Sequence, residues 1–337
     1  MPTSLDVSPT MKVLVTGASG FVGRGVCSWL DARGHDIAAS TRSARIDLPD
    51  SIRQHQVAGL GHTTDWSEAL AGRQVVVHCA ARAHVMNETA TDPLELYRKV
   101  NRDGTISLAR QAATAGVKRF IFISSIKVNG ESTQPGNPFA ADDTPRPLGP
   151  YGISKAEAEQ GLRDLARQTG MEIVIIRPPL VYGPGVKANF ASLISWVRRG
   201  IPLPVGAIQK NQRSFVALDN LTDLICLCLT HPQAANQTFL ISDGEDLSTA
   251  SLVSRIGLAL GRPARLIYVP VSWLKIASIV LRRPGLYQRL CGSLQVDISK
   301  TRALLGWSPP VSVDAALKKA AADAGARQSG HTRSNST

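Results

Sequence analysis

The chain has 337 residues, of which 43% are hydrophobic, so it can fill a full α/β domain and a smaller second lobe. Its 38 lysines and arginines exceed its 26 aspartates and glutamates, which gives a formal net charge of +12. The five cysteines have neither paired nor metal-binding spacing, which argues against a disulfide framework and a metal site and suits a reducing cytoplasm. Because the first ten residues are polar, we expect no signal peptide there.

The first predicted elements are a strand, a tight turn and a helix. An apolar, β-branched run at residues 12–16 leads into the glycine-rich segment 17–23, and apolar residues at helical spacing follow. Glycines allow positive φ and a close backbone approach, and the start of a helix offers free N–H groups and a positive dipole to a pyrophosphate. The residues that we expect to contact a dinucleotide here are Gly17, Gly20, Phe21, Val22 and Gly23.

The second predicted strand, residues 36–40, bears on the choice of cofactor. In NAD-binding proteins this strand ends near an acidic residue that binds the adenosine ribose, but here Thr41 and Arg42 follow it. Arg42 would suit the 2′-phosphate of NADP, although an arginine in a solvated loop gives the same pattern. Both NAD and NADP therefore stay open.

Two later strands end in small or hydroxyl side chains. Residues 74–81 end in Ala80 and Ala81, and small residues are needed where a cofactor lies across strand ends. Residues 120–125 end in Ser125, and open parallel sheets bind their ligands at the carboxyl ends of the strands. We therefore expect both strand ends to line one site.

Tyr151 and Lys155 are spaced so that a helix places them on one face. A free tyrosine titrates near pH 10, and a fixed cation nearby favours its phenolate and brings the group toward working pH. This spacing alone is common, so its meaning depends on the turn at residues 17–23 and on Ser125. In that context we interpret Tyr151 as an acid–base catalyst that lies close to Ser125.

The alternation of strands and helices predicts an α/β fold with a doubly wound parallel sheet. Long helices are predicted at residues 92–115 and 151–168, and a buried strand at 172–177. Prolines and glycines become dense after this strand, which marks excursions into a smaller α/β lobe. The expected organisation is a dinucleotide-binding domain at 11–180 and 214–243, a substrate-binding lobe at 181–213 and 244–324, and flexible tails at 1–10 and 325–337.

In this order the motifs resemble the extended short-chain dehydrogenase/reductases of the nucleotide-sugar epimerase and dehydratase family, and the chain is similar to UDP-galactose 4-epimerases. The resemblance covers about residues 11 to 320 and implies a Rossmann domain with a substrate lobe. The shared features are Thr16 to Gly23, His78 to Ala81, Asn101, Ser124-Ser125, Tyr151 to Lys155, Arg177-Pro178 and Val181 to Pro184.

The resemblance implies roles for individual residues. Ser125 and Tyr151 would handle the proton of a sugar hydroxyl, and Lys155 would bind the nicotinamide ribose and tune Tyr151. Asn101 and Pro178 would belong to the cofactor site.

Further positions match the substrate half of the family. Asn189 and Arg213 fall where relatives contact the nucleotide diphosphate, and Arg289 is a further candidate, because a guanidinium suits bidentate phosphate binding. Lys127 is expected to contact the substrate or its diphosphate, with a solvent-facing lysine as the alternative. Residues 126–130 lack the Asp-Glu pair of the dehydratases, which disfavours dehydration.

The resemblance therefore implies an NAD- or NADP-dependent 4-epimerase of a UDP-hexose or UDP-N-acetylhexosamine, in the synthesis of surface polysaccharide precursors. A reductase of a UDP-4-keto-6-deoxy-hexosamine is the first alternative, and Arg42 favours it slightly. A non-catalytic NAD(P)-binding sensor or scaffold is the second alternative, and the presence of Ser125, Tyr151 and Lys155 argues against it.

The positive charge is concentrated in residues 262–302, where eight basic residues accompany the single acid Asp297. Such a lobe suits a diphosphate, and no motif for reading nucleic acid accompanies it. The apolar stretch 266–281 is too short to span a bilayer, and we expect a buried helix there rather than peripheral membrane contact. The resemblance also implies a homodimer formed through the two long helices.

Overall fold

The computed structural model describes residues 10–43, 45–83, 92–281 and 284–333. The chain divides into two compact units, which are described separately. The first unit contains residues 1–124, 149–176 and 225–237, and the second contains 125–148, 177–224 and 238–337.

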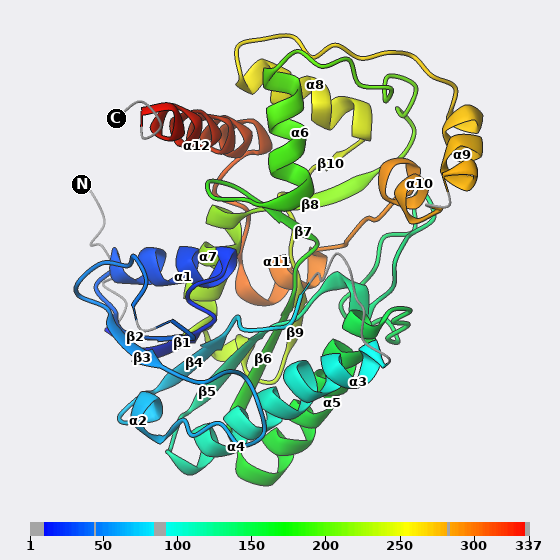
Figure 1. Ribbon diagram of the computed structural model, residues 1–337. Coiled ribbons are helices and arrows are strands. Elements are labelled where there is room, and N and C mark those ends of the chain that lie inside the picture. The colour runs from blue at the N-terminus through cyan, green and yellow to red at the C-terminus, as the bar shows by residue number, and fades with distance from the viewer. Residues whose placement is uncertain (1–9, 44, 84–91, 282–283, 334–337) are drawn as a thin grey trace, which may run out of the picture. The chain divides into compact units, whose positions relative to one another are not determined.

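A seven-stranded sheet has the order β3-β2-β1-β4-β5-β6-β9 (Figure 1). Its strands are β1 (Lys12–Thr16), β2 (Asp36–Thr41), β3 (Arg53–Gln56), β4 (Val75–His78), β5 (Arg119–Ile123), β6 (Glu172–Arg177) and β9 (Thr238–Leu240), of which β9 is counted with the second unit. The pairs from β3 to β6 are all parallel. The strand order reverses beside β1, and this switch point is where doubly wound sheets bind their ligands. The predicted doubly wound sheet is therefore confirmed.

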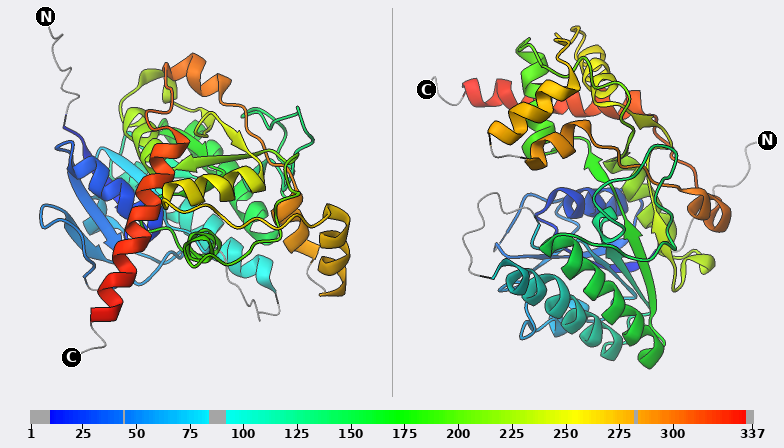
Figure 2. Two further views of the ribbon diagram at one scale, coloured as in Figure 1. Left: turned by 90° about the horizontal axis from the view of Figure 1, so that it is seen from above. Right: turned by 90° about the vertical axis from the view of Figure 1, so that its right-hand side faces the viewer.

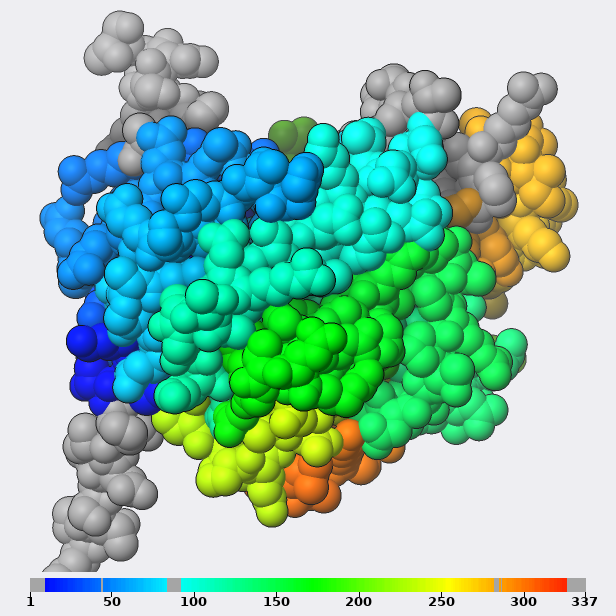
Figure 3. All heavy atoms as spheres, turned by 90° about the horizontal axis from the view of Figure 1, so that it is seen from below, coloured from blue at the N-terminus to red at the C-terminus, as the bar shows by residue number. Residues whose placement is uncertain are grey.

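Helices cover both faces of this sheet. They are α1 (Phe21–Asp31), α2 (Ser67–Leu70), α3 (Pro93–Tyr97), the π-helix η1 (Arg98–Gly104), α4 (Thr105–Thr114) and α5 (Pro150–Thr169). Figure 1 shows α1 on one face and α4 and α5 on the other, and Figure 3 shows α4 and α5 side by side at the surface. The helix predicted at 92–115 is thus three consecutive segments, α3, η1 and α4, of which the middle one is π-helical.

Apolar side chains from the strands and from α4 and α5 form the core of the first unit. Leu14, Val76 and Phe120 point from neighbouring strands into a cluster with Leu108 of α4 and Leu162 of α5, and each of these residues is fully buried. Because parallel strands are buried on both faces, they carry nearly continuous apolar runs, which is why the sequence predicts them well. This core holds the strand ends and the start of α5 in fixed positions.

The second unit is a smaller α/β lobe around the three-stranded sheet β10-β8-β7. Its strands are β7 (Leu180–Tyr182), β8 (Arg213–Ala217) and β10 (Asp246–Leu247), and its helices are η2 (Ile126–Val128), α6 (Ala188–Arg198), α8 (Thr249–Ala259), α9 (Val271–Val280), α10 (Pro284–Cys291), α11 (Ser299–Leu305) and α12 (Val313–Arg333). Helix α7 (Leu218–Cys228) contains residues of both units, and the short η3 (Pro232–Ala234) belongs to the first. The apolar core of the lobe includes Tyr182, Phe190, Phe215, Val253 and Leu317.

The predicted domain boundaries differ from the division into two compact units. Residues 125–148 and 214–224 were expected in the dinucleotide-binding domain, but both segments belong to the second unit. The reason is their pairing: the Phe139 N–H donates to the Gln295 carbonyl at 2.9 Å, and β8 pairs with β7 and β10. A sequence pattern that alternates correctly still does not say with which partner a loop or strand pairs.

Two further expectations differ from the structure. The tail expected from residue 325 is helical to Arg333, because α12 docks on α6, where the Arg198 side chain donates to the carbonyls of Ala321 and Ala324 at 2.8 and 2.6 Å. The buried helix expected within 266–281 is instead the exposed helix α9. Residues 1–9 and 334–337 of the expected tails lie outside the described residues. No helix among the described residues is long and apolar enough to cross a membrane.

Candidate active site

The turn between β1 and α1 is shaped so that only glycine fits at its key positions. Gly17 has a φ of +71°, and a Cβ built there would lie 2.7 Å from the Ala80 nitrogen. A Cβ at Gly23 would lie 2.2 Å from the Gly17 carbonyl oxygen. Gly20 begins α1 without any side-chain cap, so the N–H groups of the first helical turn, which includes Phe21 and Val22, face no side-chain acceptor. This cradle fits the pyrophosphate of a dinucleotide.

The neighbouring strand end contributes small residues and a buried histidine. His78 accepts or donates in two short contacts, with Thr16 Oγ1 at 2.6 Å and Thr105 Oγ1 at 2.9 Å. Burial lowers the pKa of His78 well below its ordinary value, so its ring is neutral. Ala80 and Ala81 follow at the strand end, half-buried. Within the residues that the structure describes, no cluster of three or more possible metal ligands occurs.

Arg42 lies just beyond β2, the strand next to β1. Its side chain is exposed, and its carbonyl oxygen accepts a hydrogen bond from Gln56 Nε2 at 3.3 Å. Thr41 donates its hydroxyl to the Ser43 carbonyl, which fixes the turn. The guanidinium is thus not committed to the core, and its predicted contact with the cofactor stays a prediction.

Helix α5 places Tyr151 in its first turn and Lys155 one turn later, as the spacing predicts. Tyr151 packs edge-on against Tyr97, with ring centroids 6.3 Å apart. Lys155 is only 1% exposed, and its ammonium donates to the Ile123 carbonyl at 2.9 Å and lies 4.3 Å from the centre of the Phe122 ring. The lysine is therefore fixed at the end of β5.

Burial lowers the pKa of Lys155 from 10.5 to about 8, because a charged amine loses its hydration there. Cys79 and, to a smaller extent, the charge of Glu159 act in the opposite direction and raise this pKa. Glu159 is fully buried one helical turn beyond Lys155, where it accepts a hydrogen bond from Ser124 Oγ at 2.6 Å and pairs with Arg163 at 3.1 Å. Glu159 is not among the site residues predicted from the sequence. The available signal was the four-residue spacing that continues from Tyr151 through Lys155 to Glu159.

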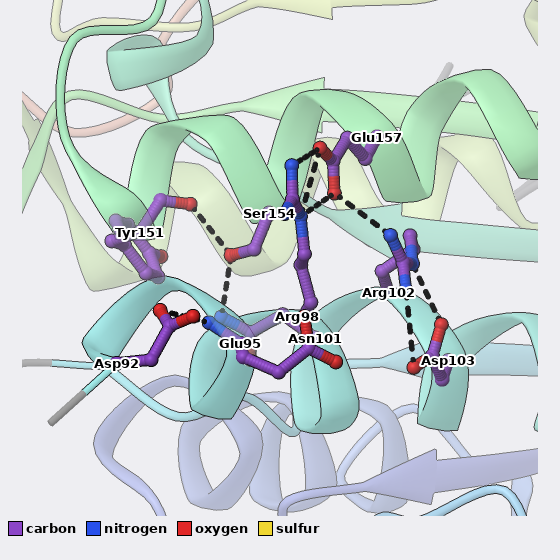
Figure 4. A network of polar contacts seen from close by, with 9 residues as sticks. All are labelled: Asp92, Glu95, Arg98, Asn101, Arg102, Asp103, Tyr151, Ser154 and Glu157. Atoms are coloured by element: carbon purple, nitrogen blue, oxygen red, sulfur yellow. Dashed lines mark hydrogen bonds and ion pairs between the residues drawn. The ribbon is translucent and has the colours of Figure 1, made fainter. Parts of the chain in front are cut away.

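Asn101 connects the π-helix to the first turn of α5 (Figure 4). Its side-chain oxygen accepts from the Arg82 N–H at 2.8 Å, and its side-chain nitrogen donates to the Arg82 carbonyl at 3.1 Å and to Ser154 Oγ at 3.0 Å. Ser154 in turn donates to the Tyr151 carbonyl at 2.9 Å. Arg98 and Arg102 bind Glu157 of α5 beside this network. Asn101 is therefore positioned to hold the segment after β4 and the start of α5 together.

Ser125 begins the short helix η2 of the second unit, where its Oγ accepts from the Lys127 N–H at 3.3 Å. Because Tyr151 belongs to the first unit, the expected proximity of Ser125 and Tyr151 stays a prediction. The ammonium of Lys127 pairs with Glu131, and the Pro178 carbonyl accepts from the Ile126 N–H at 3.0 Å.

The predicted diphosphate ligands have different environments in the second unit. Arg213 of β8 donates to the Gly292 carbonyl at 3.1 Å, just after α10, and burial lowers its pKa. It forms no ion pair with any described acidic residue. Asn189, in the first turn of α6, and Arg289, on α10, are both exposed. Arg213 is therefore a partly buried cation without an anionic partner among the described residues, and the side chains of Asn189 and Arg289 make no polar contact with that part of the chain.

Arg177 makes hydrogen bonds within the lobe to Asn129 and Ala141. Its guanidinium donates to Asn129 Oδ1 at 2.9 Å and to the Ala141 carbonyl at 3.4 Å, and its side chain is almost fully buried. These contacts tie Arg177, at the end of β6, to the loop 125–148.

Comparisons with known proteins agree with the motifs. The model of the NAD dependent epimerase/dehydratase family matches residues 13–242. A UDP-glucose 4-epimerase of Vibrio cholerae is 48% identical over 310 residues, which cover 92% of this chain and 94% of that protein. The solved structure of MoeE5 with UDP-glucuronic acid and NAD has a TM-score of 0.74 at 25% identity and covers 94% of this chain and 99% of that chain. 

A UDP-N-acetylglucosamine 4-epimerase from Bacillus cereus has a TM-score of 0.76 at 19% identity, covers 93% of this chain and 99% of its own, and confirms the fold. The resemblance predicted from the sequence is confirmed by these matches. The chain belongs to the NAD dependent epimerase/dehydratase family and is an NAD-dependent enzyme.

Proposed function

We propose that the protein is a 4-epimerase of a UDP-hexose or UDP-N-acetylhexosamine that makes precursors of surface polysaccharide. The observation that carries the proposal is the pairing of Tyr151 with the buried ammonium of Lys155 on α5. The 48% identity with a UDP-glucose 4-epimerase of Vibrio cholerae supports the same reaction.

Tyr151 is the proton carrier in this mechanism. Its phenolate oxygen takes the proton of the sugar C4 hydroxyl. After the keto sugar has rotated to present its opposite face, Tyr151 returns a proton to the C4 oxygen. The glycine-rich turn at residues 17–23 would hold NAD, which would supply reversible hydride chemistry at C4 with no net oxidation of the sugar. Tyr151 thus serves as base in the first half of the reaction and as acid in the second.

Lys155 makes the phenolate accessible at neutral pH. A cation one helical turn away stabilises the charged form of Tyr151 more than its neutral form. With a pKa of about 8, roughly nine tenths of the Lys155 side chains carry the charge at pH 7. The protein thus retains the ammonium at neutral pH but begins to lose it just above, which predicts a decline in activity on the alkaline side.

Arg213 is the residue that we assign to the nucleotide diphosphate. A partly buried guanidinium is stabilised by an anion, and its planar donors match two phosphate oxygens. Asn189 and Arg289 are exposed and free to turn toward the same group. Lys127 is the weakest candidate, because its charge is already matched by Glu131.

The direct test uses purified protein with NAD and either UDP-glucose or UDP-N-acetylglucosamine. We expect the C4 epimer to accumulate to equilibrium, measured by chromatography, with no net change in absorbance at 340 nm. Tyr151→Phe should lower kcat by about 10³-fold. If Tyr151→Phe left the rate unchanged, the catalytic proposal would have to be replaced by a cofactor-binding sensor or scaffold.

A second candidate is the reduction of a UDP-4-keto-6-deoxy-hexosamine by NADPH. It is favoured by the exposed Arg42 beyond β2, where no acidic residue follows the strand. The reductase would be supported if NADPH absorbance fell in proportion to the 4-keto sugar converted, while UDP-glucose and UDP-N-acetylglucosamine were not epimerised. Arg42→Ala should then weaken NADPH binding about tenfold and leave NADH binding unchanged.

We also propose that the protein forms a homodimer through the surface of α4 and α5 (Figure 3). This rests on the family resemblance and on the side-by-side exposure of the two helices. Light scattering should give about twice the chain mass of 36.0 kDa. A single species at the mass of one chain would contradict the dimer.

A further inference from the structure

The second unit carries an exposed apolar surface on α9 that its proposed chemistry does not use. The α9 patch consists of Tyr268, Trp273, Ile276, Ile279, Val280 and Leu281, and each of these side chains is 60–74% exposed. Most of the strongly exposed large apolar residues of the described chain lie in this short segment. Concentrated apolar exposure of this kind marks an interaction site rather than ordinary surface.

The helix is anchored from its other side. Val271 and Leu274 pack against the apolar core of the lobe, and Ser278 is the buried residue one turn later. Helical spacing therefore directs Trp273, Ile276 and Val280 away from that core. Figure 2 shows α9 next to α10, which is its main neighbour within the second unit. The apolar character of the outward side thus has no partner among the described residues.

The segment that leads into α9 is also fixed. The Leu203 N–H donates to the Arg265 carbonyl at 2.8 Å, and the Ile267 N–H donates back to the Leu203 carbonyl at 2.8 Å. A Cβ at Gly206 would come within 3.0 Å of the Ile267 carbonyl oxygen, which shows how closely these two segments of the chain approach each other. The patch is therefore displayed on an ordered support.

The stretch of sequence that contains the patch is basic. Residues 247–296 contain no aspartate or glutamate. The basic residues of this stretch are Arg255, Arg262, Arg265, Lys275, Arg282, Arg283 and Arg289. Arg265, Lys275 and Arg289 are exposed, and none of them forms an ion pair with a described acidic residue. An apolar surface of Trp, Tyr, Ile and Val within a basic stretch of sequence is complementary to an anionic lipid bilayer.

We propose that the α9 patch docks the protein on an anionic membrane surface, with α9 lying in the plane of the interface. The ten residues of α9 are about 15 Å long, half of the roughly 30 Å of hydrocarbon in a bilayer, so the helix fits on the surface and not across it. A second copy of the chain is a poorer occupant, because a two-fold interface would bring the same basic side chains together.

Vesicle flotation tests the proposal with the full-length protein. The vesicles are phosphatidylcholine mixed with phosphatidylglycerol, with pure phosphatidylcholine for comparison, at low and high salt. We expect flotation with the anionic vesicles that weakens at high salt. Trp273→Ala and Lys275→Glu should each lower the partition coefficient about tenfold. Both side chains are exposed, so the variants should keep the fold, and Ile276→Ser is a second apolar variant in case one does not.

Matched control variants carry the same kinds of substitution outside the α9 patch. Trp196→Ala removes an exposed tryptophan from α6, and Lys118→Glu makes the same change of charge in the first unit. Both should float like the unchanged protein. Quenching of tryptophan fluorescence by brominated acyl chains should occur and be lost in Trp273→Phe, because that ring enters the lipid.

Two kinds of result would overturn the proposal. One is a failure in the flotation assay: either the protein does not float with anionic vesicles at low salt, or the matched control variants lose as much binding as the patch variants. The other is a dimer in solution that Trp273→Ala dissociates, because the patch would then be a contact between two copies. Neither result depends on which sugar the enzyme converts.

Discussion

Glu159 should set the pH range in which the enzyme works, and Glu159→Gln tests this. Its carboxylate lies one helical turn from Lys155 and raises the pKa of that lysine. Neighbouring charges about 6 Å apart at an effective dielectric constant of about 20 interact by roughly 3 kcal/mol. Because Arg163 already balances part of the Glu159 charge, we expect about half of this to act on Lys155.

The expected result is a pKa of Lys155 that is lower by about one unit in the variant. Lys155 stabilises the Tyr151 phenolate only while it is protonated, so the alkaline limb of the pH profile of kcat/KM should move down by about one unit. The acidic limb, which reports the ionisation of Tyr151, should move much less. The assay is epimerisation of the UDP-sugar between pH 6 and pH 10, for both proteins.

Asp164→Asn is the matched control, because it removes a carboxylate from the same helix at a partly exposed position where Asp164 pairs with Arg167. Its profile should coincide with that of the unchanged enzyme. Should Glu159→Gln lower kcat at every pH without moving the alkaline limb, Glu159 would act only through the hydrogen bond with Ser124. The electrostatic reasoning would then be wrong.

Three other predictions concern Lys155, Gly23 and Arg213. Because folding lowers the pKa of Lys155 to about 8, the buried charge lowers the free energy of unfolding below pH 8. This loss of stability disappears as the pH rises from 8 to 10.5. The stability of Lys155→Met relative to the unchanged protein should therefore fall by about 3 kcal/mol between pH 7 and 10.5, measured by urea denaturation. Gly23→Ala should weaken NAD binding at least 100-fold in calorimetry, because its Cβ collides with Gly17, whereas Gly285→Ala, with open space around it, should not. Arg213→Met should raise the KM for the UDP-sugar about 100-fold with a much smaller change in kcat; an unchanged KM would remove Arg213 from the diphosphate site.

Local patterns predicted most of the first unit, for physical reasons. The turn at Gly17 requires positive φ, and a glycine between a β-branched run and a helical pattern has few other uses. The spacing of Tyr151 and Lys155 is a property of one helix, so it survives whatever packs around it. Buried parallel strands must be apolar throughout, which makes them visible as runs.

Features that depend on distant partners could not be predicted in this way. Glu159 has the pattern of an ordinary helix glutamate until its contact with Ser124, the residue after β5, and its burial are known. An apolar helix such as α9 has the same sequence whether protein or lipid covers it, so its exposure was not foreseeable. The loop 125–148 likewise shows its partner only through pairing with residues about 160 positions away.

The energetics of α5 connect the fold with the proposed chemistry. A lysine buried to 1% exposure lowers stability by about 3 kcal/mol at neutral pH, judged from its pKa of about 8. An apolar side chain of similar length would avoid this loss, so packing alone gives no reason for an amine at position 155. The second buried charge, Glu159, reduces the loss and keeps the amine protonated at neutral pH. Such an arrangement is expected where a positive charge must act on a neighbouring phenol, and Tyr151 is the phenol within one turn.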